Sequence, residues 1–178
     1  MMQTTLTALR KKLSGKLSED DLYEICYYAQ GIGDNPTNLA LYRLLYDNDK
    51  RIANNAAWVF THFDLHSNRW LYDKHDALID EAMQTTDQTK RRLLLSLLLR
   101  QPFSSENFRA DFLNFCLDCI TAIHASISIK SLCMKLAYEQ SKPYPELLDE
   151  LRNILELMEV ELLPTGVKTT RKNMLKLL

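Results

Sequence analysis

A segment of twelve residues recurs three times along this chain, and the repeat limits the possible folds more than any other feature. The copies occupy residues 49–60, 87–98 and 126–137, so successive copies begin 38 and 39 residues apart. Each copy opens with a polar residue suited to cap a helix, continues with basic residues and an apolar run, and precedes a second amphipathic stretch. A helix pair repeated at this interval is typical of an α-solenoid, in which each repeat packs against its neighbours.

Glycine and proline fall at the boundaries between amphipathic stretches, where they end helices rather than interrupt them. No convincing strand alternation appears, and the short linkers favour antiparallel helix pairs. We therefore expect one all-α domain over residues 1–178, with about ten helices and capping helices at both ends. The predicted helices are 4–13, 19–30, 36–46, 50–63, 69–84, 88–100, 105–123, 127–141, 145–160 and 167–177.

The charge of the chain is nearly balanced, with a formal net charge of −1. A dedicated nucleic-acid binder normally has a strong basic excess, so the balance disfavours that class. Residues 1–17 and 162–178 each hold four bases and no acid, which leaves 14 basic against 23 acidic residues between them. The simplest interpretation of the basic ends is that they are solvated terminal helices.

The sequence also predicts a cytoplasmic protein. The first seventeen residues are too polar for a secretory signal, and the longest apolar run, 93–99, is too short to span a membrane. Cys26, Cys116, Cys119 and Cys133 lie among apolar neighbours in predicted helices, so we expect them to be reduced core thiols.

The repeated segment resembles the second helix of a HEAT unit. The resemblance is carried by Asp49-x-Arg51-x-x-x-x-Ala56-Ala57 and extends over roughly residues 36–160. The later copies are more degenerate, since the second lacks the alanine pair and the third lacks the leading aspartate. Membership of the HEAT and armadillo family implies a right-handed α-α superhelix, and it implies a protein-interaction scaffold rather than an enzyme.

Two motifs could bind a metal or act in redox chemistry, but core packing explains the cysteines and a surface or loop position explains the histidines. Cys116 and Cys119 form a CxxC near His124, but they lie in a helical core pattern without a second CxxC. His62 and His66 have the spacing of a zinc-binding pair, but they fall where a helix should end. We therefore predict no metal site and no cofactor.

An alternative function comes from a branch of HEAT-like proteins, the DNA glycosylases that remove alkylated bases. Trp58, Trp70, Tyr72 and Asp73 supply the aromatic and acidic side chains that a flipped cationic base would need. The acidic body of the chain argues against this alternative, and against a HEAT-like DNA-binding protein more generally. Motifs such as the P-loop, GxGxxG, GxSxG and HExxH are missing from the sequence, which also favours a binding protein over an enzyme.

Aligning the three copies predicts a binding face on the second helix of each pair. Equivalent polar positions step by three or four residues, so they share one side of each helix. The partner expected on this concave face is another protein, with Trp58 and an arginine as anchors. An alternative is a third class, a structural subunit that oligomerises through its basic C-terminal helix. The proposed face consists of Asn54, Trp58, His62, Arg92, Ser96, Arg100, Lys135 and Glu139, with Ser131 at the remaining equivalent position.

Overall fold

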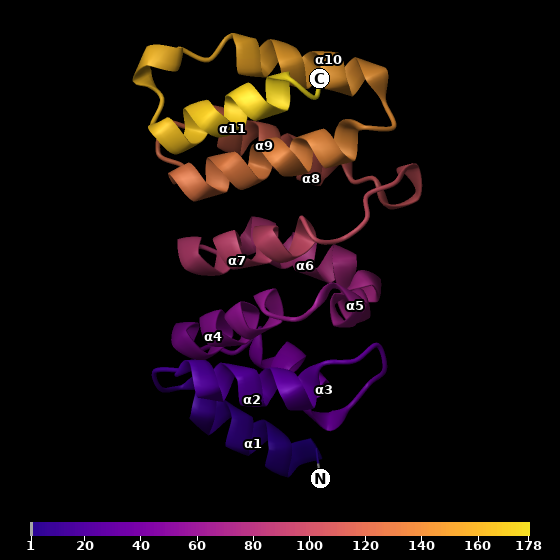
Figure 1. The fold of residues 1–178 in the computed structure, drawn as a ribbon, viewed down its shortest axis with the longest axis vertical. Coiled ribbons are helices and arrows are strands. Elements are labelled where there is room, and N and C mark those ends of the chain that lie inside the picture. Colours follow the sequence, from indigo (N-terminus) through magenta and orange to yellow (C-terminus); the bar gives the residue numbers. More distant parts are fainter. Residues whose placement is uncertain (1) are drawn as a thin grey trace. The chain divides into compact units, whose positions relative to one another are not determined.

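The computed structural model describes residues 2–178, and within that range the chain is helical without any β-strand (Figure 1). The predicted all-α fold is therefore confirmed. The helices are α1 (Met2–Leu13), α2 (Glu19–Ala29), α3 (Pro36–Leu44), α4 (Lys50–Thr61), α5 (Leu65–Asn68), η1 (Arg69–Lys74), α6 (His75–Gln84), α7 (Gln88–Leu98), η2 (Ser105–Asn107), α8 (Ala110–Thr121), α9 (Ile127–Ser141), α10 (Pro145–Glu156), η3 (Val160–Leu162) and α11 (Thr165–Leu175).

The main departure from the predicted helices lies before α6. The predicted helix 69–84 begins at His75, because residues 65–74 form the short helix α5 and the 3-10 turn η1. Trp70 explains the difference, since its indole is buried and its Nε1 donates a hydrogen bond of 2.8 Å to Asp34 Oδ1. The 3-10 turn thus brings the Trp70 ring into the core, whereas a regular α-helix over the same residues would place this ring differently.

The described chain forms two compact units, residues 2–101 and 102–178. In the first unit α4 and α7 pack side by side, with α3 against α4 and α6 against α7. In the second unit α9 packs against α8, α10 and α11. The predicted stacking of the second helices is thus observed for α4 and α7, whereas the third predicted member, α9, belongs to the other unit. A single domain over the whole chain stays a prediction.

Each copy of the repeat begins a helix for a local reason. The Asp49 carboxylate accepts hydrogen bonds from the backbone N–H groups of residues 51 and 52, and Asp87 does the same for residues 89 and 90. The Ser126 hydroxyl accepts from the backbone N–H of Ile129. These caps satisfy donors that have no partner inside the helix, which explains the polar residue at the start of each copy.

The second helices α4, α7 and α9 each contribute several apolar residues to the core. Ala53, Ala56 and Ala57 of α4 are buried and let neighbouring helices approach closely. The apolar pattern predicts seven buried leucines and phenylalanines, and five of them are buried: Leu95, Leu98, Phe112, Leu136 and Leu151. The prediction is wrong for Phe115 and Leu132, which are half-buried.

Some basic residues of the second helices have a structural role. The Arg91 guanidinium donates to the carbonyls of Ala82, Met83 and Thr85 at the C-terminal end of α6. The Arg171 guanidinium does the same at residues 155 and 156, where α10 ends. A cation at a helix C-terminus satisfies unpaired carbonyls and complements the helix dipole. These arginines therefore join the two helices of one pair.

A pH-dependent contribution to stability is expected where α1 meets α2. Asp21 accepts hydrogen bonds from the hydroxyl and backbone N–H of Ser18, and lies 3.0 Å from Lys12 Nζ. The Ser18 bonds, aided by Lys12, lower the pKa of Asp21 to about 2. Because an unfolded aspartate has a pKa near ~4, this stabilisation is complete above that pH and is lost as the pH falls towards 2.

Chemical unfolding of the parent and of Asp21→Asn, measured at several pH values, tests this expectation. The difference in unfolding free energy should be largest near neutral pH and should vanish as the pH falls to about 2. Asp20→Asn removes a charge from the same helical turn but leaves the capping box intact, so it serves as the control. A difference between parent and Asp21→Asn that stays constant with pH would contradict the assignment.

Candidate functional site

The first unit contains six of the eight predicted binding residues, on the adjacent helices α4 and α7. These helices run in the same direction, because contacts join both pairs of equivalent ends. At one end Asn54 Nδ2 donates to Asp87 Oδ2 over 3.1 Å, and at the other the Arg100 guanidinium donates to the carbonyls of Thr61 and Phe63. Arg100 thus meets the backbone on either side of His62, and Asn54 meets the capping residue of α7.

Trp58 and His62 form an aromatic pair on α4. Their rings meet edge to face with centroids 4.9 Å apart, and His62 Nδ1 lies 2.9 Å from the Trp58 carbonyl oxygen. Trp58 is half-buried, so part of its indole is open to a partner. Indoles of this kind are common anchors in protein interfaces.

A shallow depression of about 440 Å³ adjoins Trp58. The basic side chains that line it are Lys16 and Arg51, and none of its lining residues is acidic. Asn55 forms part of the wall and donates to the carbonyls of Leu13 and Gly15, which fixes the loop after α1. The depression therefore offers an aromatic face next to positive charge, which suits an anionic group on an otherwise apolar segment.

The predicted residues of α7 differ in their availability. Ser96 Oγ donates 2.9 Å to the carbonyl of Arg92 in its own helix. The guanidinium of Arg92 is half-buried, and the described residues include no hydrogen-bond or ion-pair partner for it. Arg92 is thus the arginine of this face that is free to bind a partner.

Arg100 has a different role from the one that the sequence suggested. Its guanidinium bonds the carbonyls of Thr61 and Phe63, where α4 ends. Burial lowers the pKa of Arg100, while the nearby carboxylate of Asp64 acts in the opposite sense. Arg100 caps a helix of the fold, so a partner would have to compete with two carbonyls for it.

Lys135 and Glu139 lie on α9 in the second unit. Lys135 is exposed, and the Glu139 carboxylate forms an ion pair of 2.7 Å with Lys142. Ser131, one turn earlier, is half-buried. The continuation of the α4–α7 face onto these residues stays a prediction.

Most of the helices in these repeats carry charged side chains mainly of one sign. Within the first unit α4 and α7 hold five basic residues and no acid, and α6 holds three acids and no lysine or arginine. Within the second unit α9 and α11 hold five basic residues against Glu139, and α8 and α10 together hold six acids and one base. Averaging along the sequence hides this pattern, because acidic and basic helices alternate. We call these helices the basic face of their unit: α4 and α7 in the first unit, and α9 and α11 in the second.

The thiols and histidines lie as the core and loop interpretations predict. Cys26, Cys116 and Cys133 are buried and Cys119 is half-buried, and none of the four forms a disulfide within residues 2–178. Burial raises the pKa of Cys26 to about 11. His62 and His66 lie on opposite sides of the break between α4 and α5. Among residues 2–178 no cluster of three or more metal-ligating side chains occurs.

The residues of the glycosylase hypothesis lie in more than one place, since Trp58 lines the depression beside α4 whereas Trp70 and Asp73 both contact Lys74. The Trp70 ring is in the core, where it stacks on Phe60 at 6.1 Å and Lys74 Nζ lies 3.8 Å from its centroid. Asp73 is exposed and forms an ion pair with the same lysine. Trp70 is therefore a structural anchor, and Trp58 is the tryptophan that a ligand can reach.

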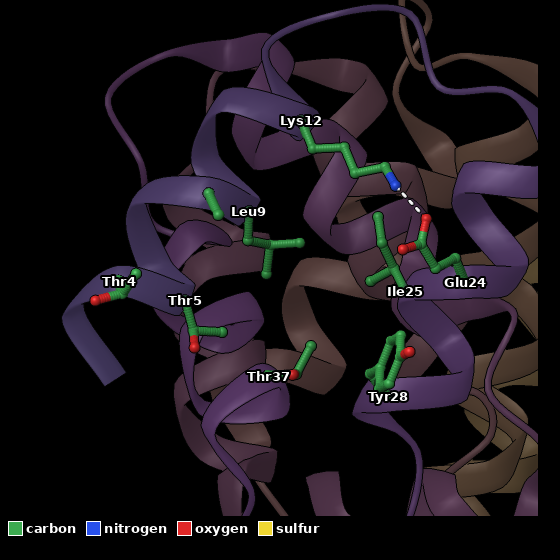
Figure 2. Close-up of a pocket in the computed structure, with 9 residues that line it drawn as sticks. Thr4, Thr5, Leu9, Lys12, Glu24, Ile25, Tyr28 and Thr37 are labelled. Carbon is green, nitrogen blue, oxygen red and sulfur yellow. Dashed lines mark hydrogen bonds and ion pairs between the residues drawn. The ribbon is translucent and has the colours of Figure 1, made fainter. Parts of the chain in front are cut away.

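Sequence reasoning missed a pocket of about 370 Å³ that is lined by α1, α2 and α3 (Figure 2). Leu9, Ile25 and Tyr28 line it together with Thr4, Thr5 and Thr37. Its charged side chains, Lys12 and Glu24, pair with each other. The lining thus has no free charge, and no pattern along the sequence indicates the pocket because three helices build it.

Comparison with known protein families identifies one match, to the model of the HEAT repeat domain, over residues 9–178. No curated protein and no solved structure matches the chain. Within residues 2–178 no helix has the length and apolarity needed to cross a membrane.

Proposed function

The chain belongs to the HEAT repeat domain family, and from that premise we propose that it is a non-catalytic, cytoplasmic protein-interaction scaffold. Its partner is an acidic segment of another protein, which binds the basic face of the first unit. The family supports interaction as the general role, and the buried free thiols are compatible with a reducing compartment.

The observation that carries this proposal is the separation of charge between the helices. The helices α4 and α7 hold basic residues and no acid. The side chains of Lys50, Arg51 and Arg92 do not cap a helix, so they can meet a partner. A surface of one sign steers an oppositely charged partner and fixes its register. Trp58 beside these charges supplies the apolar contact that turns an encounter into a stable complex.

A second candidate partner is nucleic acid, and the same charge pattern favours it. The acidic body of the chain seemed to oppose this partner, but most of the acids within helices lie on first helices such as α6 and α10. The two partners differ in the expected salt dependence. A polyphosphate releases counterions and loses affinity steeply as salt rises, whereas a protein contact anchored on Trp58 retains more of its affinity.

The test is a double substitution, Trp58→Ala with Arg92→Ala, in the full chain. Partners captured from the native extract by the parent protein should be lost or bound about 100-fold more weakly, because two anchor side chains together contribute roughly 3 kcal/mol. Affinity for a purified partner is measured by titration calorimetry at two salt concentrations, with random-sequence duplex DNA as a parallel ligand.

The matched control is Tyr27→Ala with Arg43→Ala, which removes an aromatic ring and a guanidinium from exposed positions of α2 and α3. This control should bind like the parent. Equal binding by the Trp58/Arg92 variant would refute the site, and tighter, strongly salt-dependent binding to DNA than to any protein would replace the proposed function by the second candidate.

A further inference from the structure

The second unit contains an apolar groove at one end of its helices. The groove has a volume of about 700 Å³ and lies between the α8–α9 connection, residues 122–126, and the α10–α11 connection, residues 157–164. Ile120 and Val167 are buried beneath it, and Ile154 of α10 also lines it. The remaining lining is almost entirely aliphatic, with Lys130 and Glu159 as its charged members.

Large apolar side chains at the rim of this groove face the solvent. Ile123 is 89% exposed, Leu157 83% and Leu162 76%. Single exposed leucines are ordinary, but several that line one groove mark a surface that binds another molecule. Because the rim is so open, the groove would leave much of a small ligand in water, whereas small-molecule sites bury most of theirs. The occupant is therefore a macromolecular segment.

The charge on one wall indicates what kind of segment fits. Glu159 lines the groove, Glu156 ends α10 directly before the lining residue Leu157, and Glu161 directly precedes the lining residue Leu162. All three are exposed, and their carboxylates form no ion pair within the described part of the chain. Counted together, Glu156, Glu159 and Glu161 outnumber Lys130 and the Arg171 guanidinium, which meets the carbonyls of residues 155 and 156, so the complementary segment is basic.

A second copy of this chain does not offer such a segment. Its helices with three basic residues and no acid are α1, α7 and α11. The leucines of the apolar run 93–98 in α7 are buried, and α1 and α11 also bury apolar residues in their own units. Leu9 and Leu13 of α1 are buried, as are Val167 and Met174 of α11. None of these helices can present leucines and lysines together to a groove without leaving its place in the fold.

We propose that the apolar groove binds a basic amphipathic helix of a partner protein. Apolar side chains of that helix, spaced by three and four residues, contact the aliphatic lining, and its lysines or arginines pair with Glu156, Glu159 and Glu161. The groove belongs to the second unit, whereas the acidic partner is assigned to the basic face of the first unit, so the scaffold would hold one acidic and one basic partner in different units.

The experiment uses a fluorescein-labelled synthetic peptide of leucine and lysine, about fourteen residues long and patterned as an amphipathic helix. A leucine–glutamate peptide of the same pattern is the comparison ligand. Fluorescence anisotropy with the full chain should show binding of the lysine peptide about tenfold tighter, or more, than of the glutamate peptide.

Two variants separate charge from apolar contact. The triple variant Glu156→Gln, Glu159→Gln and Glu161→Gln should weaken binding about tenfold at low salt, with a smaller loss at high salt. The double variant Ile123→Ser with Leu157→Ser should weaken it by about tenfold at both salt concentrations, because the apolar anchors are removed. Both variants change exposed side chains, and circular dichroism checks that they stay folded.

The matched control is Glu106→Gln, Glu146→Gln and Glu150→Gln, which removes the same charge from exposed positions of the second unit outside the rim wall. Parent-like binding by this control supports the groove. An equal loss in the control would assign the binding to net charge alone, and equal affinity for both peptides would overturn the charge argument. A parent protein that self-associates in sedimentation, with Ile123→Ser/Leu157→Ser monomeric, would make a second copy the occupant and refute the proposal.

Discussion

Replacing Leu98 by alanine is expected to lower the free energy of unfolding by about 2–5 kcal/mol. Leu98 is fully buried in the last turn of α7, where α6 and α4 pack against that helix. The substitution removes apolar contacts and leaves a cavity that a close-packed helix interface fills only in part. Urea unfolding followed by circular dichroism measures the change.

Leu65→Ala provides the control for this prediction. Leu65 lies in the same unit, at the start of α5, and is exposed. Its truncation should change stability by less than about 0.5 kcal/mol. A loss for Leu98→Ala as small as that of the control would contradict the assignment of Leu98 to the core.

Replacing Arg100 by alanine is expected to destabilise the first unit by about 2 kcal/mol, since hydrogen bonds from a charged donor contribute roughly 1.5–3 kcal/mol. The variant leaves the carbonyls of Thr61 and Phe63 without their guanidinium partner at the end of α4. Thermal and urea unfolding of the variant and the parent measure the effect.

Arg92→Ala is the matched control, because it removes a guanidinium from α7, which ends just before Arg100, without breaking a hydrogen bond or ion pair in the described part of the chain. It should change stability by less than about 0.5 kcal/mol. Arg100→Lys should restore only part of the loss, because one ammonium cannot reproduce the forked contact with two carbonyls. Parent-like stability of Arg100→Ala would show that solvent satisfies these carbonyls equally well.

This pair of variants also clarifies the binding experiment. If Arg100→Ala abolishes partner binding, the cause is either the loss of a direct contact with the partner or the loss of structure at the end of α4. A binding assay does not distinguish these two causes. Substitutions of Trp58 and Arg92 avoid this ambiguity, since neither side chain forms a hydrogen bond or ion pair with another helix in the described part of the chain. The structure thus changes which substitutions test the predicted face, while the face itself stays a prediction.

The positions of the helices were predictable from the sequence because their signals are local. Asn35 caps α3 through backbone N–H groups two and three residues ahead, and Asp49 and Asp87 act over the same short distance. The apolar period within each repeat then indicates which side of α4 and α7 enters the core. The main error, residues 65–74, arose where the burial of Trp70 by distant residues decided the local backbone.

The availability of individual side chains was decided by the tertiary structure. Arg92 and Arg100 lie on the same predicted face in a repeat alignment, yet only Arg100 meets carbonyls, and these lie 37 and 39 residues away in the chain. The apolar groove likewise combines two connections more than thirty residues apart, near 123 and 157. Capping depends on neighbours within one helical turn, so the sequence by itself determined where the helices begin. The partners of a guanidinium and the walls of a groove come from the packing of helices that are distant in the chain, and no local pattern encodes that packing.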